Sequence, residues 1–375
     1  MAEVPEFDIM VDADDLNNRK NVVNQVLAKL GKDWKPEDVK IEDVDGGQAN
    51  RMLRCYTRSI DDGILFRVTR DRFPTFTNLE RNFTIYRLMD DIGVGPNVLC
   101  RLRNGICYEY IMGKSFSMKN FPVEFRDLTV TKLVAKELAK IHSKKTKSLA
   151  LEKYNMTPEN SKWGIFEWLL DEYEKPMMEE EAQQIKDSPA FPTKAEFLAE
   201  KQEIEEVVSG LGFDRVFSHN DAYFGNVIHN EEKGTAMIVD YDVCSYNNQG
   251  FDIANFPIAS AVGYLAIDRR GEKRSLNTPE FYREYLWSYL EKLSEVDEWG
   301  RDITEKDVER MYVKIQKMTL YCILYLVTIC VLVGTKPALR PGQGPRQVMD
   351  AGRDLWRLYR ELKNEVLALE IPSAD

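Results

Sequence analysis

Apolar residues recur every three or four positions in the long segments of the chain and alternate with polar residues in several short segments. The first spacing predicts helices and the second predicts half-buried strands. Helices are predicted over 15–31, 79–89, 130–142, 193–211, 279–293, 308–332 and 346–369. Strands are predicted over 52–56, 63–69, 98–102 and 105–111. The early strands and later helices, in a chain of 375 residues, favour two domains.

A second group of short apolar runs lies in the middle of the chain, between residues 216 and 255. The runs 216–217, 227–228 and 237–239 each stop at a polar residue or at a turn. The polar segment 229–234 contains Gly234 and suits a hairpin connection. Asp221 and Asn226 are therefore expected on one side of a hairpin, with Asp240 at the end of its return strand.

These three side chains suit magnesium-assisted phosphoryl transfer. Magnesium binds oxygen ligands and keeps several waters, so Asp240 and the amide of Asn226, beside nucleotide phosphates, would be enough protein ligation. Asp221 is then free to orient an acceptor hydroxyl and take its proton. Asp and Asn are also common turn residues. The ordered set favours the catalytic interpretation; it also includes His219, Asn220 and Asp252.

A glycine pair precedes the first strong strand. Gly46 and Gly47 would let backbone amides approach phosphate oxygens, and Asn50 is available as a polar contact. The segment is not a Walker A loop, because the Lys-Ser/Thr ending is missing. On its own, a glycine pair would indicate only a turn.

The central stretch resembles a known family. The sequences HNDAYFGN (219–226), IVDYD (238–242) and YNNQGFDIAN (246–255) resemble the signature region of the choline/ethanolamine kinases, and weaker similarity extends upstream to about residue 45. The resemblance implies an α/β (α+β), two-lobed protein-kinase-like fold, as in the aminoglycoside phosphotransferases. Its small lobe, 1–112, would hold an antiparallel sheet, and its large, mainly helical lobe would be 113–375.

By this resemblance, Asp221 is the catalytic base and Asn226 and Asp240 are the magnesium ligands. Asp252 resembles a buried aspartate that braces the catalytic loop. Arg67, a charged residue inside a predicted strand, resembles the arginine that binds nucleotide phosphates.

The remaining nucleotide contacts come from the same resemblance. Glu80 resembles the acid that orients the phosphate-binding arginine, although a weak surface ion pair is the alternative. Gly46, Gly47 and Asn50 resemble the family's phosphate loop, with Ala49 where Ser or Thr is usual. Glu109 and Ile111 would offer backbone groups to the adenine edge.

The implied activity is ATP- and magnesium-dependent phosphorylation of a small amino alcohol, choline first and ethanolamine second, at the start of phospholipid head-group synthesis. One alternative keeps the fold and changes the acceptor, for example to an aminoglycoside. Another is a catalytically weak regulatory homologue, which Ala49 favours and the Asp221, Asn226 and Asp240 set opposes. The resemblance also suggests a homodimer.

The acceptor pocket departs from the family. Relatives usually follow this motif with an aromatic residue and a Glu-Trp pair, whereas here Asn255 precedes Phe256-Pro-Ile. A quaternary ammonium is held by aromatic faces and carboxylates, so other residues would have to enclose it. The candidates, each of which could instead be a core residue, are Tyr246, Phe256, Tyr264, Tyr321, Tyr325 and the carboxylate of Asp242. A weaker choline KM, by about tenfold, or a shifted acceptor preference is expected.

Composition narrows the partners. A formal net charge of −11 argues against nucleic acid or an anionic membrane as the main partner. The six cysteines lack metal or disulfide spacing, and three histidines make a zinc site unexpected. The apolar run 318–334 is shorter than the ~20 residues of a membrane span, which favours a buried helix. The first residues lack the features of a signal peptide, so a cytoplasmic enzyme is expected.

Overall fold

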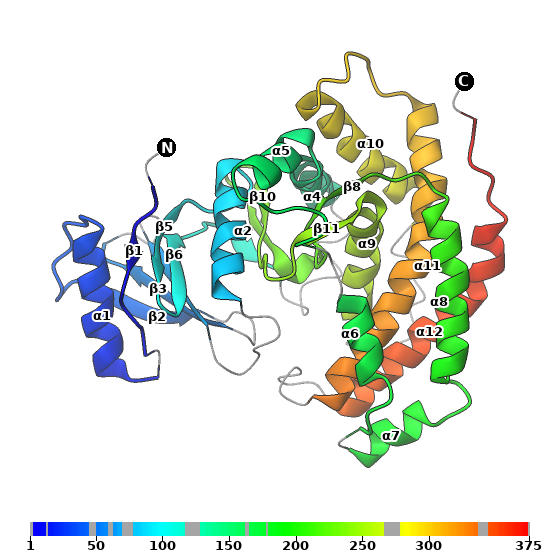
Figure 1. The fold of residues 1–375 in the computed structure, drawn as a ribbon, viewed down its shortest axis with the longest axis horizontal. Helices are drawn as coiled ribbons and strands as arrows, with labels where there is room; N and C mark the ends of the chain where they lie inside the picture. The colour runs from blue at the N-terminus through cyan, green and yellow to red at the C-terminus, as the bar shows by residue number, and fades with distance from the viewer. Residues whose placement is uncertain are drawn as a thin grey trace. The chain divides into compact units, whose positions relative to one another are not determined.

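The computed structural model describes residues 3–12, 14–44, 50–58, 63–69, 78–116, 128–161, 165–177, 179–265, 278–336 and 344–373. The chain forms two compact units (Figure 1). The first unit comprises Met1–Lys114 and Asn230–Asp242, and the second comprises Ser115–His229 and Val243–Asp375. This division differs from the predicted lobes mainly because Asn230–Asp242 groups with the first unit.

The first unit is built on a six-stranded sheet with the order β1-β5-β6-β4-β3-β2. Its neighbouring strands are antiparallel, as predicted, except for the edge pair β1 and β5, which is parallel. The strands are β1 (Glu6–Phe7), β2 (Lys40–Val44), β3 (Asn50–Tyr56), β4 (Ile64–Thr69), β5 (Val98–Leu102) and β6 (Gly105–Glu109).

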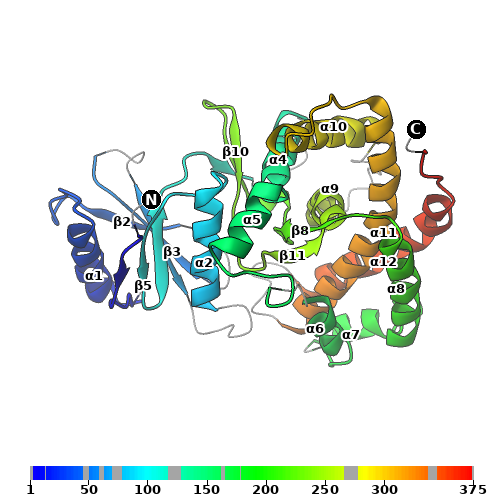
Figure 2. The ribbon, with the colours of Figure 1, turned by 45° about the horizontal axis from the view of Figure 1, so that its top comes forward.

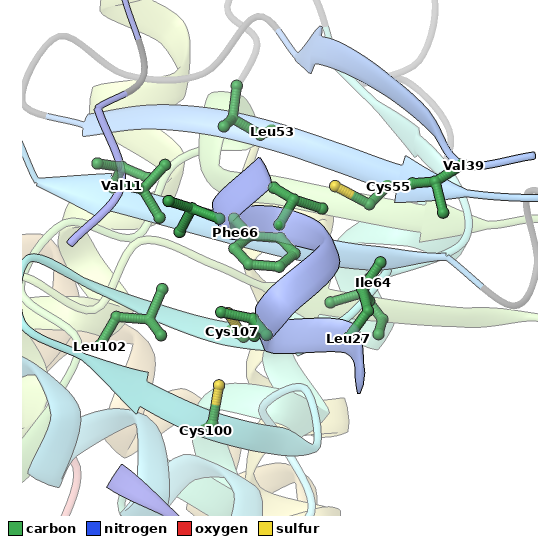
Figure 3. Close-up of a cluster of buried hydrophobic side chains, with 14 residues drawn as sticks. Val11, Leu27, Val39, Leu53, Cys55, Ile64, Phe66, Cys100, Leu102 and Cys107 are labelled. Atoms are coloured by element: carbon green, nitrogen blue, oxygen red, sulfur yellow. The ribbon is translucent and has the colours of Figure 1, made fainter. Parts of the chain in front are cut away.

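One face of this sheet packs against helix α1 (Leu16–Lys29). Asp15 caps the helix by accepting hydrogen bonds from the backbone N–H groups of Asn17 and Asn18. Gly31, at a φ of +69°, ends the helical segment in the left-handed conformation that glycine adopts readily. The shared core includes Leu27, Leu53, Phe66, Leu102 and Cys107 (Figure 3). Each such aliphatic or aromatic side chain contributes about 1.5–3 kcal/mol on burial.

The opposite face packs against α2 (Leu79–Asp91), whose Tyr86 ring stacks on Tyr108 of β6 at 5.3 Å. Side chains alternate between faces along a strand. Arg67, which follows the core residue Phe66 in β4, therefore projects toward α2, away from the α1 core.

The second unit is mainly helical. Figures 1 and 2 show α8 and α12 beside the long α11, and α4 packs against α10. The helices are α4 (Leu128–Ile141), α5 (Lys144–Glu152), α6 (Ile165–Glu172), α7 (Glu180–Lys186), α8 (Lys194–Ser209), α9 (Gln249–Leu265), α10 (Pro279–Val296), α11 (Glu305–Thr335) and α12 (Pro345–Leu367).

Helix α11 contains the apolar run that resembles a membrane span. The helix has 31 residues, so the argument from shortness was wrong. Of its apolar window, however, 83% is buried inside the protein. The interpretation as a buried core helix is therefore confirmed, on the ground of burial.

The central stretch forms the predicted strands and turns. Strand β8 (Arg215–Ser218) pairs with β11 (Ser245–Asn248), and the 3-10 turn η1 (Phe224–Asn226) leads into β9 (Val227–Asn230). Strand β10 (Thr235–Ile238) is the neighbour of β9, which confirms the hairpin. Gly234 occupies the connection with a φ of +60°.

Candidate functional site

The loop that follows β8 is held by the buried carboxylate of Asp252 in α9. Its two oxygens accept hydrogen bonds from the backbone N–H groups of His219, at 2.6 Å, and Asn220, at 2.7 Å. His142 Nε2 lies 3.0 Å from the same carboxylate, and its Nδ1 lies 2.8 Å from the hydroxyl of Tyr289. Burial opposes ionisation of Asp252, but the bonds from His142 and His219 outweigh it and lower its pKa. This arrangement agrees with the predicted brace.

Asn220 holds the next turn. Its φ is +67°, a left-handed conformation that Asn tolerates better than most residues. Its buried Nδ2 donates to Ser245 Oγ at 2.9 Å and to the Val243 carbonyl at 3.0 Å, and its Oδ1 accepts from Asn247. The loop is therefore held in place by the side chain of Asn220 and also by the backbone N–H groups of His219 and Asn220, which bind Asp252.

This loop presents Asp221, which is half-buried, beside Asn226. Asn226 Nδ2 donates to the Asp221 carboxylate at 3.0 Å and to its backbone carbonyl at 2.9 Å. The amide nitrogen is thereby committed, and the amide oxygen is the atom that Asn226 could offer to a cation. The predicted base and one predicted metal ligand are thus neighbours in the second unit.

Aromatic side chains from α11 gather near Asp221. Tyr321 and Tyr325 both contact the rings of Phe166 and Phe251, with centroid distances of 5.3–6.3 Å. Burial and, after it, the negative charge of Asp221 raise the pKa of Tyr325 well above its usual value. Two of the predicted acceptor residues therefore belong to one cluster within electrostatic range of Asp221.

The other aromatic candidates lie elsewhere. Tyr246, in β11, is fully buried against Phe217. Phe256 is fully buried between Phe224 and Tyr285. Both have the environment of core residues, the alternative considered for them. Tyr264 belongs to α9, but its side chain lies outside the described part of the chain.

The first unit holds a second buried polar cluster, centred on the Asp242 carboxylate. Arg67 forms a close ion pair with it, Asn82 donates to it at 3.1 Å, and Asn50 donates at 3.3 Å. Arg67 is 2% exposed and also lies over the Tyr86 ring. Asp242 is therefore engaged by cationic and amide groups of its own unit, and its predicted role as the carboxylate for a cationic head group is not supported.

Several buried atoms of this cluster lack a hydrogen-bond partner among the described residues. They are Arg67 Nη1, Asn50 Oδ1 and Asn82 Oδ1. A buried polar atom without a partner costs about 1–3 kcal/mol, so such atoms need an explanation, for which a bound ligand is one candidate. One free guanidinium N–H on a fixed arginine suits an anionic oxygen.

Asp240 lies next to this cluster at the end of the hairpin's return strand. Its φ is +70°, a strained conformation for Asp, and its Oδ1 lies 3.9 Å from Arg67 Nη2. Burial and the negative charge of Asp242 raise the pKa of Asp240 to about 6, although Arg67 acts in the opposite direction. The Asp240 carboxylate is an oxygen ligand of the kind that a small hard cation such as magnesium binds.

The predicted pair between Arg67 and Glu80 is not formed. Glu80 is exposed and pairs with Arg101 at 2.6 Å, because it occupies the solvent side of the first turn of α2. Asn82 faces the cluster instead. Its position among the apolar residues Leu79, Phe83 and Tyr86 is a signal in the sequence that a polar partner lies inside, although Asn82 was not among the predicted site residues.

The remaining nucleotide candidates are only partly described. Gly46, Gly47 and Ala49 lie outside the described residues. Glu109, at the end of β6, uses its backbone N–H for the Asn97 carbonyl at 3.0 Å. Ile111 is half-buried in the segment that follows. Their predicted contacts with adenine stay predictions.

Comparisons with known proteins agree with these observations. A family model described as choline/ethanolamine kinase matches residues 41–336. Ethanolamine kinase 1 of Mus musculus is 26% identical over 334 residues, covering 85% of this chain and 84% of the relative. Ethanolamine kinase 2 of Mus musculus is 28% identical over 329 residues, covering 85% and 75%.

Solved structures agree on the fold. An ethanolamine kinase of Plasmodium vivax aligns with a TM-score of 0.66 at 16% identity, covering 94% of this chain and 90% of that one. A choline kinase of Cryptosporidium parvum aligns with a TM-score of 0.67 at 16% identity, covering 92% and 96%. The kinase-like fold class predicted from the sequence is therefore confirmed.

Proposed function

Because the chain belongs to the choline/ethanolamine kinase family, and is therefore a phosphotransferase, we propose that it transfers the γ-phosphate of ATP to the hydroxyl of ethanolamine, with choline as a weaker acceptor. The observation that carries the proposal is the pair of half-sites. One is a fixed arginine in the first unit, Arg67, whose Nη1 has no hydrogen-bond partner among the described residues. The other is a braced loop that presents Asp221 and Asn226 in the second unit.

Arg67 would bind the nucleotide phosphates. Asp242 holds its guanidinium by a buried ion pair, and Tyr86 lies against its plane. A guanidinium fixed in this way loses little side-chain freedom when it binds a phosphate oxygen. Its Nη1, which has no partner among the residues that the structure describes, would donate a hydrogen bond to such an oxygen.

Asp221 would orient the acceptor hydroxyl and collect its proton. An alcohol is a poor acid, so a carboxylate does not deprotonate it in advance. It accepts the proton late, in the loose transition state of phosphoryl transfer. The hydrogen bond from Asn226 keeps the Asp221 carboxylate in one orientation for this step.

By the family resemblance, Asp240 and the Oδ1 of Asn226 would each be a magnesium ligand. Their donor set, one carboxylate and one amide oxygen, fits a small hard cation that keeps several waters. When bound, magnesium neutralises the charge on the β- and γ-phosphate oxygens. The strained Asp240 backbone is consistent with a functional position.

The acceptor preference rests on two arguments. The mouse relatives reported above are both named ethanolamine kinase, and the family's Glu-Trp pair is absent after Asn255. A quaternary ammonium has no N–H donors and depends on aromatic faces, whereas a primary ammonium has three N–H donors. We assign the contact with either head group to Tyr321, which is half-buried, and to Tyr325, which lies within range of the charge of Asp221.

The test is steady-state phosphoryl transfer by the purified protein with ATP and magnesium. The acceptor panel comprises ethanolamine, its N-methylated forms, choline and an aminoglycoside. We expect kcat/KM to fall stepwise with methylation and the choline KM to exceed that of ethanolamine by about tenfold. Equal or better use of choline would contradict the acceptor preference, and no turnover of either amino alcohol would contradict the function.

The proposal includes a cellular setting. Phosphorylation of this head group would be an early step in making phospholipids, carried out in the cytoplasm by a homodimer. Light scattering of the purified protein tests the dimer. A monomer has a mass of 43.5 kDa, and a dimer should give twice this value. Fractionation of the expressing cells tests the location.

A further inference from the structure

A cavity of about 600 Å³ lies in the second unit where α10 leads into α11, the connection visible above these helices in Figure 1. Its lining includes Arg301, Lys306, Arg310 and Lys314, with Trp299 as an aromatic wall. Asp307 is the single acidic side chain of the lining. Four cations against one anion form a local positive site in a chain of net charge −11.

Three of these cations come from one face of α11. Lys306, Arg310 and Lys314 recur every four residues, so they lie one above another along the helix. Like charges at this spacing destabilise a helix, and cations near its beginning also oppose the helix dipole. These three cations therefore destabilise the helix, and helix formation does not explain their presence.

The described residues do little to neutralise this face. Lys306 and Arg310 form no hydrogen bond or ion pair with any described residue, and Lys314 lies over the Phe213 ring at 5.3 Å. Burial and, after it, the positive charge of Arg310 lower the pKa of Lys314, against a smaller effect of Asp214. Arg310 and Lys314 thus repel each other.

The acidic residue and the helix start are already occupied. Asp307 accepts two hydrogen bonds of 2.8 Å from Arg301 and also takes part in the capping box with Thr304. The first backbone amides are therefore partly satisfied, and an incoming anion would bind to the side chains of Lys306, Arg310 and Lys314.

A second basic cavity, of about 480 Å³ on α12, provides a contrast. Its Arg353 pairs with Asp350 at 2.9 Å, and its Arg357 pairs with Asp354 at 3.4 Å. These cations carry their own counter-ions within the helix. The α11 cavity differs because, although Arg301 pairs with Asp307, Lys306, Arg310 and Lys314 have no ion pair with a described residue and are available to an external anion.

We propose that the cavity at the start of α11 binds a phosphate monoester group. A compact anion of about two negative charges matches three cations that line one cavity, with Arg310 offering paired N–H donors and the two lysines acting as point charges. The ring of Trp299 would pack on whatever carries the phosphate. The site takes this group either from a small soluble molecule or from an anionic lipid head group, and it is separate from the residues proposed for phosphoryl transfer.

The test compares the wild-type protein with the triple variant Lys306→Gln, Arg310→Gln, Lys314→Gln. Binding of inorganic phosphate is measured by titration calorimetry, and binding to phosphatidylcholine vesicles containing phosphatidic acid is measured by co-sedimentation. We expect wild type to bind at least one of these probes and the triple variant to bind it at least tenfold more weakly. Arg357→Gln, in the α12 cavity, is the matched control and should bind as wild type does.

The midpoint of thermal unfolding shows whether the triple variant loses binding because it is unfolded. Removing mutually repelling cations should leave the midpoint of the triple variant unchanged or higher. Binding of phosphate alone assigns the site to a soluble ligand, and binding of vesicles assigns it to a lipid head group. The proposal is overturned if wild type binds neither probe, if the triple variant binds as tightly as wild type, or if Arg357→Gln loses as much affinity.

Discussion

Two aspartates, the fully buried Asp252 in the second unit and the partly buried Asp242 in the first, illustrate different uses of the same side chain. Asp252 is fully buried and meets two backbone N–H groups and His142. Asp242 meets Arg67, Asn50 and Asn82. The groups around Asp242 include buried atoms, among them Arg67 Nη1, that have no hydrogen-bond partner in the described part of the chain.

The difference indicates that Asp252 has a structural role and that Asp242 belongs to a ligand-binding site. A carboxylate whose partners are backbone N–H groups fixes the course of the chain, and its removal should act on the fold. A carboxylate that orients a guanidinium with a spare donor prepares that donor for a ligand. Variants in the two clusters should therefore change different measured quantities.

The largest effect is expected for Asp240→Ala. Without this carboxylate, the amide oxygen of Asn226 is the remaining proposed ligand, and it carries no charge to hold a divalent cation. Activity should fall to background at any magnesium concentration that can be reached. Activity that persists with the wild-type magnesium dependence would identify Asp240 as a structural residue at the strand end.

Asp242→Asn should raise the KM for ATP by about tenfold or more, because Arg67 loses the charged partner that fixes its guanidinium. The measurement is an ATP titration at saturating acceptor, with a thermal unfolding scan to establish that the variant is folded. An unchanged KM for ATP in a folded variant would show that Asp242 does not prepare Arg67 for phosphate.

Asp252→Asn should act on stability instead. An amide cannot accept from both backbone N–H groups and His142 together, so the loss is about 3 kcal/mol, the order of one or two charge-assisted hydrogen bonds. Denaturant unfolding measures it, and the KM for ATP of the folded fraction should stay near the wild-type value. A stability equal to that of wild type would remove Asp252 from its role as the brace.

The same aspartate predicts a dependence of stability on pH. The pKa of Asp252 is lower in the folded protein than in the unfolded chain, so its contribution is fully present above the unfolded value. It is lost as the pH falls through the lowered, folded value. Stability measured from pH 7 downward should therefore fall less for Asp252→Asn than for wild type, and parallel curves would contradict this linkage.

Magnesium activation should weaken as the pH falls toward 6. The pKa of Asp240 is raised to about 6, and its protonated form has no charge for the cation. The magnesium concentration needed for half-maximal activity should rise up to about tenfold per pH unit below 6. In Asp242→Asn, which removes a neighbouring negative charge, this rise should begin at lower pH; identical profiles would contradict the coupling.

The smallest effect is expected for Glu80→Gln. Glu80 is exposed and pairs with Arg101, and such surface pairs contribute about 0–1 kcal/mol. Neither turnover nor the KM for ATP should change by more than about twofold. A large loss of ATP affinity would show that Glu80, rather than Asp242, orients Arg67 during turnover.

Much of the fold could be predicted because local pattern and tertiary burial agree. The alternating strand 63–69 and the amphipathic helix 15–31 became β4 and α1 with nearly the same ends. The hairpin that separates Asn226 from Asp240 also followed from short-range signals, namely the apolar runs and Gly234. Such features depend on neighbours in sequence, which a single chain displays.

The partners of buried charges could not be predicted in the same way. Arg67 and Asp242 are 175 positions apart, and their sequence neighbourhoods do not reveal which of several acids the arginine meets. The environment of Tyr246 posed the same problem, because its full burial follows from the pairing of β11 with β8. Asn82 was a readable exception, since a polar residue on the apolar side of α2 calls for a buried partner.

The central claim, that Asp221 is the base of an amino-alcohol kinase, is tested most directly by comparing Asp221→Asn with wild type. Phosphoethanolamine formation is measured at saturating ATP, magnesium and ethanolamine, together with equilibrium binding of ATP. We predict a fall in turnover of about a hundredfold or more with ATP binding unchanged, because the amide keeps the shape of the carboxylate but cannot accept the proton. Equal turnover by the two proteins would contradict the claim.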